Sequence, residues 1–232
     1  MKKRNSILTA LLLCSSMSVS AAVQLSSSRI IFKEGQKEAT LTMRNTASNQ
    51  SFLVQTWLSD VNNNKLTPSP FLLTPPLFKM TQNSSANLRV INSGRQSFAQ
   101  DKETLFRLNI LSIPSQTDAE GAKLVVNNRS IIKFIYRPAS LSDHDAALAY
   151  QKLQIKTDGK YLTLTNPTPY YVNIGQISLN GARLSANDLS AMGTVPPSGT
   201  VTLPYNVTLR NVTLTAIGDR GALLTPRSVQ LP

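Results

Sequence analysis

The sequences LFRLNILSIP at residues 105–114 and IIKFIYRP at residues 131–138 decide the fold of this chain. Both stretches are rich in β-branched, aromatic and other apolar residues, and such runs bounded by turn residues indicate β-strands. The second stretch ends at Pro138, which fixes its own φ and has no amide hydrogen to donate to a neighbouring strand. We therefore expect two long strands here, with a break in the pattern after the second.

Shorter runs of the same composition lie on both sides of these stretches. Turn residues separate the runs, for example Glu34-Gly35 and Ser93-Gly94. Seven or so strands over about 115 residues are typical of an immunoglobulin-like β-sandwich. Besides the two long stretches, the strands expected in this part of the chain are residues 23–32, 39–44, 52–58, 88–91 and 124–126.

A second set of runs follows the break at residues 137–140. Asn180-Gly181 is the strongest hairpin signal in the chain, because these residue types adopt the positive φ angles that a two-residue turn requires. A helical pattern is confined to a short segment near residues 143–153. The strands expected here are residues 153–155, 161–165, 171–179, 200–203, 207–214 and 223–231.

These patterns predict an all-β protein made of two immunoglobulin-like β-sandwich domains joined by a short linker. The boundaries that we expect are residues 22–138 for the first domain and residues 139–232 for the second.

The beginning of the chain has the layout of a secretory signal peptide. Three basic residues at positions 2–4 precede a short apolar stretch at 7–14, and small residues follow as far as Ala21. The apolar stretch is too short to span a bilayer. We expect residues 1–21 to be removed, with cleavage after Ala22 as the close alternative. The mature chain would then have 232 − 21 = 211 residues and a net charge of 21 − 12 = +9.

The composition excludes several classes of function. The chain has one His and one Cys, and Cys14 leaves with the signal peptide, so neither a Cys/His zinc cluster nor an internal disulfide is available. A Ser–His–acid triad could use only His144, and a single His is more often solvated than catalytic. The scattered Lys and Arg residues argue against nucleic acid, and no later segment is apolar enough to enter a membrane. We expect no enzymatic activity, no cofactor and no metal.

Six segments spread along the chain carry a family resemblance: residues 23–32, 52–57, 74–78 (TPPLF), 105–114, 131–138 and 217–221 (IGDRG). Together they resemble the periplasmic pilus (fimbrial) assembly chaperones of the PapD-like family. The resemblance implies two immunoglobulin-like domains in an L-shaped, boomerang arrangement. It also implies a periplasmic protein that binds, folds and caps pilus subunits and delivers them to an outer-membrane usher.

The mechanism that the resemblance implies is donor-strand complementation. The chaperone lends a strand to a subunit that lacks its own last strand, so backbone hydrogen bonds close the open sheet edge and alternating side chains fill its pockets. By resemblance, the lent strand is residues 124–130, with Leu124 and Val126 on one face. Asn128 stands where the family usually has a third hydrophobic residue. From periodicity alone, these side chains could equally belong to the core of the first domain.

Two basic residues are expected to anchor the subunit. Arg29 and Lys133 each lie inside an apolar run, and periodicity alone favours outward-facing charges on half-exposed strands. The resemblance instead assigns them to the domain cleft, where they bind the C-terminal carboxylate of the subunit through charge-assisted hydrogen bonds.

The resemblance also implies an ionic cluster between the domains, formed by Glu103, Arg137 and Asp219. Without it, three unrelated surface charges would be the simpler interpretation. Two positions depart from the family pattern near the expected usher surface: Ser51 replaces a common proline, and Arg107 replaces a common aromatic residue.

Three further expectations complete the interpretation. Trp57 should lie in the sandwich core. The short loop between Pro114 and Lys123, which has no Cys, resembles the short-loop branch of the family. An available strand also leaves open a homodimer in which free chains cap each other. The alternative function is an exported structural or adhesive two-domain β-sandwich protein.

Overall fold

The computed structural model describes residues 23–115, 125–205 and 207–231. The expected signal peptide and Leu124 lie outside the described residues. Among the described residues, no helix is long and apolar enough to cross a membrane.

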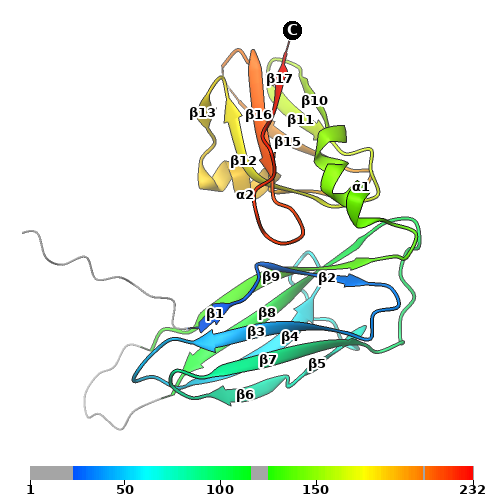
Figure 1. Cartoon of the computed structure of the whole chain (residues 1–232). Coiled ribbons are helices and arrows are strands. Elements are labelled where there is room, and N and C mark those ends of the chain that lie inside the picture. Colours follow the sequence, from blue (N-terminus) through cyan, green and yellow to red (C-terminus); the bar gives the residue numbers. More distant parts are fainter. Residues whose placement is uncertain (1–22, 116–124, 206, 232) are drawn as a thin grey trace, which may run out of the picture.

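The first domain is a β-sandwich of two sheets, seen in the lower half of Figure 1. One sheet has the strand order β1-β3-β7-β5 and the other has the order β2-β9-β8-β4-β6. Neighbouring strands are antiparallel except β2 and β9, which are parallel. The strands are β1 (Val23–Leu25), β2 (Arg29–Lys33), β3 (Glu38–Asn45), β4 (Phe52–Ser59), β5 (Phe71–Thr74), β6 (Leu77–Met80), β7 (Ser85–Asn92), β8 (Thr104–Pro114) and β9 (Asn128–Arg137).

Apolar side chains that alternate along the strands fill the space between the two sheets. In β4, for example, Phe52, Val54 and Leu58 are buried in the core. Phe71 of β5 contacts rings from the opposite sheet, with centroid distances of 4.6 Å to Phe134 and 5.0 Å to Phe32. The apolar runs separated by turn residues therefore predicted the sandwich correctly.

The first expected strand, residues 23–32, is wrong as a single element. It consists of β1, which pairs with β3 in one sheet, and β2, which pairs with β9 in the other. The chain changes sheets at Ser27, whose hydroxyl group donates to the carbonyl of Arg29 and accepts from its amide. Three consecutive serines at residues 26–28 interrupt the apolar pattern at the crossing, and this polar stretch was a signal that could have revealed it.

Two other differences concern strands at the edges of the pattern. β5 and β6 were not expected, because they flank the prolines at 75–76, which are typical turn residues. The strand expected at 124–126 is also wrong in its described part, since Val125 and Val126 have no regular secondary structure and β9 begins at Asn128.

The prediction that Trp57 lies in the sandwich core is wrong. Successive side chains of a strand point to opposite faces of the sheet. Since the neighbours Thr56 and Leu58 point inward, Trp57 points to the outer face of the five-stranded sheet. There it is only half-buried, and the guanidinium group of Arg129 lies 5.0 Å from its ring centroid. Trp57 therefore contributes to a surface rather than to the core.

The second domain is a smaller sandwich with its own core. Its sheets have the orders β10-β11-β15 and β13-β12-β16-β17, and β14 also pairs with β12. The elements are α1 (Asp143–Leu148), the 3₁₀ helix η1 (Ala149–Lys152), β10 (Gln154–Thr157), β11 (Tyr161–Thr165), β12 (Val172–Leu179), β13 (Ala182–Arg183), α2 (Ala186–Met192), β14 (Thr194–Val195), β15 (Thr200–Pro204), β16 (Asn211–Ala216) and β17 (Arg227–Gln230).

Local signals in this domain were mostly reliable. Asn180 and Gly181 have φ angles of 50° and 85° and join β12 to β13, which confirms the predicted hairpin. The helical segment near 143–153 is confirmed as α1 and η1. Helix α2 was missed, although Ser185 caps it by accepting a hydrogen bond from the amide of Asp188. A Ser followed three residues later by an acidic residue is a helix-start signal that could have revealed it.

The two sandwiches lie at an angle to each other and meet where β9 leads into α1 (Figure 1). The loop after β16 extends from the second domain towards the first. This arrangement brings β9 close to residues of β12 and of the loop after β16, and the candidate site lies there.

Candidate functional site

Arg29 and Lys133 are side by side on the sheet surface that faces the second domain. The parallel pairing of β2 with β9 places these two residues directly opposite each other. On the other side of Lys133, the antiparallel pairing of β9 with β8 places Arg107 opposite it. Three basic residues therefore form a row across three adjacent strands.

The two expected anchor residues are held by uncharged oxygen atoms of the second domain. The ammonium Nζ of Lys133 donates to Oδ1 of Asn173 at 2.6 Å. The Nη1 of Arg29 donates to the backbone carbonyl of Ile217 at 3.4 Å. Arg29 is only 6% exposed, and its buried Nε has no hydrogen-bond partner among the described residues. Within the described chain, neither cation forms a salt bridge with a carboxylate.

Burial and mutual repulsion make these positive charges costly. Burial, together with the charges of Arg29 and Arg107, lowers the pKa of Lys133 to about 8. Burial also lowers the pKa of Arg29, against an opposing attraction from Asp219. An anion entering the cleft would stabilise both cations, so the row is suited to binding a carboxylate.

A cleft of about 550 Å³ adjoins Lys133 on the side of Arg107. Leu105 and Ile131 of the first domain line it, and Tyr171 together with residues of α2 and β14 closes it from the second domain. Ile131 is 44% exposed, so the floor of the cleft offers apolar surface to a partner.

Glycine at position 175 allows the loop after β16 to approach the cleft. Gly175 lies at a register shift in β12. A Cβ added there would lie 2.7 Å from Cγ1 of Ile217 and 2.6 Å from Cδ2 of Leu223, which is closer than real atoms pack. Gly175 therefore helps to bring the carbonyl of Ile217 to Arg29.

One edge of β9 has no partner over half its length. β8 pairs with residues 128–136 of β9, whereas β2 pairs with residues 133–137 only. Among the described residues, no strand lies beside residues 128–132 on the side of β2. The backbone groups on this edge are available to another strand, and the open edge ends at the pair Arg29–Lys133.

The residues expected to be lent to a subunit precede and begin this edge. Val126 is 67% exposed and Asn128 is also exposed. They contact no core of the first domain, whereas Leu124 is not among the described residues. The core interpretation therefore does not apply to the described members of this segment.

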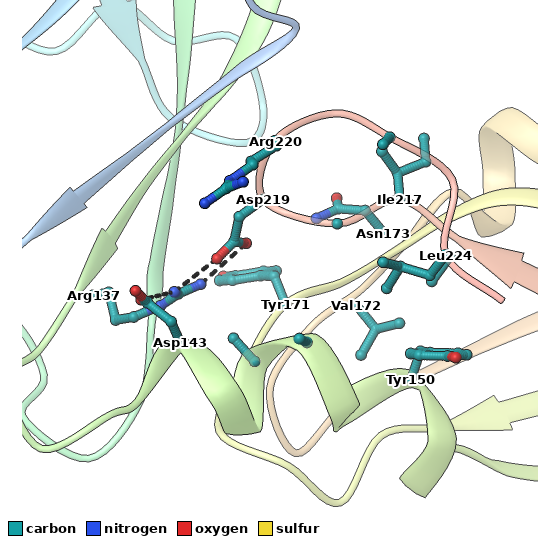
Figure 2. Close-up of a pocket in the computed structure, with 15 residues that line it drawn as sticks. Arg137, Asp143, Tyr150, Tyr171, Val172, Asn173, Ile217, Asp219, Arg220 and Leu224 are labelled. Atoms are coloured by element: carbon teal, nitrogen blue, oxygen red, sulfur yellow. Dashed lines mark hydrogen bonds and ion pairs between the residues drawn. The ribbon is translucent and has the colours of Figure 1, made fainter.

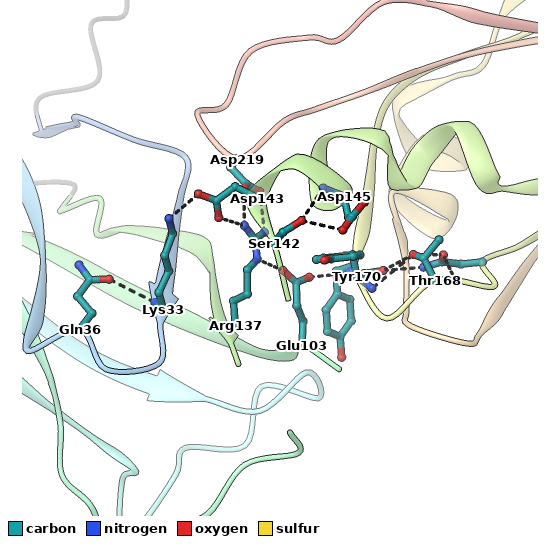
Figure 3. A network of polar contacts seen from close by, with 12 residues as sticks. Lys33, Gln36, Glu103, Arg137, Ser142, Asp143, Asp145, Thr168, Tyr170 and Asp219 are labelled. Carbon is teal, nitrogen blue, oxygen red and sulfur yellow. Dashed lines mark hydrogen bonds and ion pairs between the residues drawn. The ribbon is translucent and has the colours of Figure 1, made fainter. Parts of the chain in front are cut away.

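The structure brings Glu103, Arg137 and Asp219 together at the domain junction (Figure 3). The Nε of Arg137 donates to Glu103 at 2.7 Å, and its Nη1 donates to Asp219 at 2.8 Å. The second oxygen of Glu103 accepts from the amide of Tyr171 at 2.7 Å. Burial alone would lower the pKa of Arg137, but its acidic partners raise the pKa above its usual value.

Two members of this network were missed in the sequence. Asp143 accepts from Nη1 of Arg137 at 2.7 Å and also pairs with Lys33 of β2 (Figure 3). The sequence shows that Asp143 follows the N-cap Ser142 in the first turn of a helix, but it does not show which residue Asp143 binds.

His144, the neighbour of Asp143, is exposed. No group of metal-ligating side chains occurs in the part of the chain that the structure describes.

Replacing Arg137 should destabilise the protein strongly. We expect Arg137→Ala to lower the free energy of unfolding by about 3–5 kcal/mol, because Glu103 would stay buried without a cation. The control Lys33→Ala breaks an exposed pair and should cost less than about 1 kcal/mol. Urea unfolding followed by tryptophan fluorescence measures both. Equal costs for the two variants would contradict the buried-cluster interpretation.

Comparisons with known proteins agree with this architecture. Residues 22–142 match the family model described as "Pili and flagellar-assembly chaperone, PapD N-terminal domain", and residues 148–228 match "Pili assembly chaperone PapD, C-terminal domain". The chain is 36% identical over 214 residues to the chaperone protein FimC of Escherichia coli K12, covering 89% of this chain and 83% of FimC. It is 36% identical over 203 residues to the chaperone protein MrkB of Klebsiella pneumoniae, covering 84% and 85%.

Solved structures show the same two-domain arrangement. The Salmonella enterica SafA pilin in complex with the SafB chaperone matches with a TM-score of 0.78 and 27% identity, covering 90% of this chain and 96% of that one. The periplasmic chaperone SfaE matches with a TM-score of 0.71 and 30% identity, covering 90% and 98%. With both domains matched in order and the fold in agreement, this chain belongs to the PapD family of periplasmic pilus assembly chaperones.

Proposed function

We propose that this chaperone captures pilus subunits in the periplasm by donor-strand complementation, caps them and delivers them to an outer-membrane usher. The observation that carries the proposal is the adjacent pair of the buried Arg29 and the partly buried Lys133, which have only uncharged partners and lie where the open edge of β9 ends. Such a pair needs an anion, and the C-terminal carboxylate of a strand bound to that edge would supply it.

The pairing of β2 indicates how the strand of the subunit would lie. β2 runs parallel to β9 and begins at Arg29. A bound strand that continues the line of β2 along residues 128–132 would end at Arg29 with its carboxylate. It would therefore run in the same direction as β9. The first residues of β9 and the segment before it would then be the lent strand.

Side chains of the lent strand would fill the open core of the subunit. We assign this role to Leu124 and Val126. Asn128, next on the same face, would place an amide in the third pocket. A buried amide needs a hydrogen-bond partner there, so we expect a pilus subunit with a polar or shallow third pocket.

The remaining parts of the proposal concern export and partners. Residues 1–21 are proposed to direct export and to be removed, and the mature protein is proposed to act without catalysis or cofactor. We also propose membership of the short-loop branch. An exposed donor segment further supports mutual capping of free chains as a homodimer.

Removal of either anchor should abolish efficient capture. We expect Lys133→Ala and Arg29→Ala to weaken the binding of pilus subunits by about 2–5 kcal/mol each, the usual cost of truncating one partner of a buried charge pair. Periplasmic co-expression with candidate pilus subunits, followed by co-purification, measures the yield of a one-to-one complex. Lys79→Ala, which replaces an exposed residue of β6, is the control and should capture as the wild type does.

Unchanged capture by the anchor variants would make the carboxylate assignment wrong. A protein that captures no pilus subunits but binds an immobilised glycan would instead support the alternative function, an exported structural or adhesive β-sandwich protein.

Substitutions on the two faces of the lent segment should differ in their effect on the capture of pilus subunits. Leu124→Ser and Val126→Ser should weaken capture, because each removes apolar area worth about 1.5–3 kcal/mol when buried. The free chaperone should remain folded, since Val126 is exposed in it. Val125→Ser is the matched control, because Val125 would point away from the core of the bound subunit. Unfolding of Leu124→Ser, or equal loss in Val125→Ser, would contradict the donor assignment.

Capture of the carboxylate should depend on pH above neutrality. Lys133 has a pKa of about 8 in the free protein, and a bound carboxylate would raise that pKa. Binding therefore takes up a proton above pH 8, and affinity should fall by nearly tenfold per pH unit there and be constant below it. Calorimetry with a synthetic peptide that copies the last residues of a pilin measures this, with the amidated peptide as control. Lys133→Arg should remove the dependence, and a wild-type affinity that stays flat up to pH 9.5 would contradict the prediction.

A further inference from the structure

Asn173 connects the two anchor cations through one short chain of hydrogen bonds. Its side chain is 5% exposed, and its Oδ1 accepts from Nζ of Lys133 at 2.6 Å. Its backbone carbonyl accepts from the amide of Ile217 at 2.7 Å, and the carbonyl of Ile217 accepts from Arg29. Figure 2 shows Asn173 and Ile217 next to each other on the second domain, to the right of the ion pairs of Arg137.

The acceptor that Asn173 offers to Lys133 differs from a carboxylate in its charge. An amide oxygen satisfies the ammonium group and fixes its direction, but it carries no charge. A carboxylate at the same place would form an ion pair with Lys133 and cancel half of the positive charge of the pair. The amide therefore orients the cation and leaves its charge available to an incoming anion.

The other charged and titratable groups around Lys133 do not neutralise it. Arg29 on β2 and Arg107 on β8 are cations that repel it. The phenol of Tyr171, which lines the same cleft, has its pKa raised by burial and so stays uncharged. Asp219 attracts Arg29 but is hydrogen-bonded to Arg137. Among the described residues, the uncharged amide oxygen of Asn173 is consequently the group that binds the ammonium group of Lys133 directly.

We propose that Asn173 is a positioning residue for the capture of pilus subunits, which holds the charged Lys133 beside Arg29 through an uncharged acceptor so that both cations meet the carboxylate of the incoming strand. This inference rests on the proposed function. It assigns to the second domain a direct part in anchor binding, although both anchor residues belong to the first domain.

The test uses two variants of nearly equal size with opposite electrostatic effects. Asn173→Asp adds a carboxylate in place of the amide, and Asn173→Leu removes the acceptor. The readouts are the affinity for the free-carboxylate pilin peptide from pH 6.5 to 9.5 and the urea midpoint of the full mature chain. Lys133→Ala is measured in parallel.

For Asn173→Asp we expect peptide binding at least tenfold weaker at pH 7.5 and a urea unfolding midpoint no lower than that of the wild type. The affinity of this variant should begin to fall only above pH 8. The internal carboxylate would compete with the peptide and raise the pKa of Lys133. For Asn173→Leu we expect threefold to tenfold weaker binding and a fall that begins below pH 8, because the cation loses its acceptor.

Two results would overturn the inference. One is wild-type affinity and pH dependence in Asn173→Asp. The other is a loss of affinity in both variants that parallels the loss of folded protein, while the pH at which affinity begins to fall is unchanged. A purely structural contact would behave in this way. If Lys133→Ala binds the peptide normally, the proposed function itself fails. The inference fails separately when Lys133→Ala abolishes binding and the Asn173 variants behave as the wild type.

Discussion

The parallel pairing between β2 and the second half of β9 is the constraint on which the rest of the structure depends. β2 is short because the chain crosses from one sheet to the other at Ser27. It therefore covers β9 only from Lys133 onwards and leaves the preceding edge open. The same pairing places Arg29 directly beside Lys133 at the end of that edge. One crossing between sheets thus creates both the open edge and the cation pair that terminates it.

The domain junction determines what these cations face. Arg137, four residues after Lys133 on the same strand, binds Glu103, Asp143 and Asp219. Buried ion clusters often fix geometry more than they add stability, because desolvation offsets much of the attraction. Here the cluster fixes the second domain where its uncharged oxygens reach Lys133 and Arg29. The acidic side chains of the junction are engaged by Arg137, so the anchor pair keeps its charge for a partner.

Much of the fold could be predicted from local patterns. The apolar runs that form β4, β8 and β9, separated by turn residues, predicted a sandwich, and Asn180-Gly181 predicted a hairpin that forms. The failures have different causes. Trp57 faces outward because it alternates with the buried Thr56 and Leu58, and α2 begins at a local capping signal, so local patterns could have revealed both. The sheet that each half of residues 23–32 joins depends instead on neighbours distant in sequence.

The sequence by itself determined two β-sandwich domains and the basic residues in apolar runs, because residue type and strand patterns are local properties. It indicated the junction of Glu103, Arg137 and Asp219 only through the family resemblance. Only the tertiary structure decided that Arg29 and Lys133 are neighbours, that Asp143 joins Arg137, and that Asn173 meets Lys133 across the domains. These contacts join residues that lie far apart in the chain or on different domains. Their positions follow from strand register and from the packing of the two domains, and a single sequence encodes neither as a local pattern.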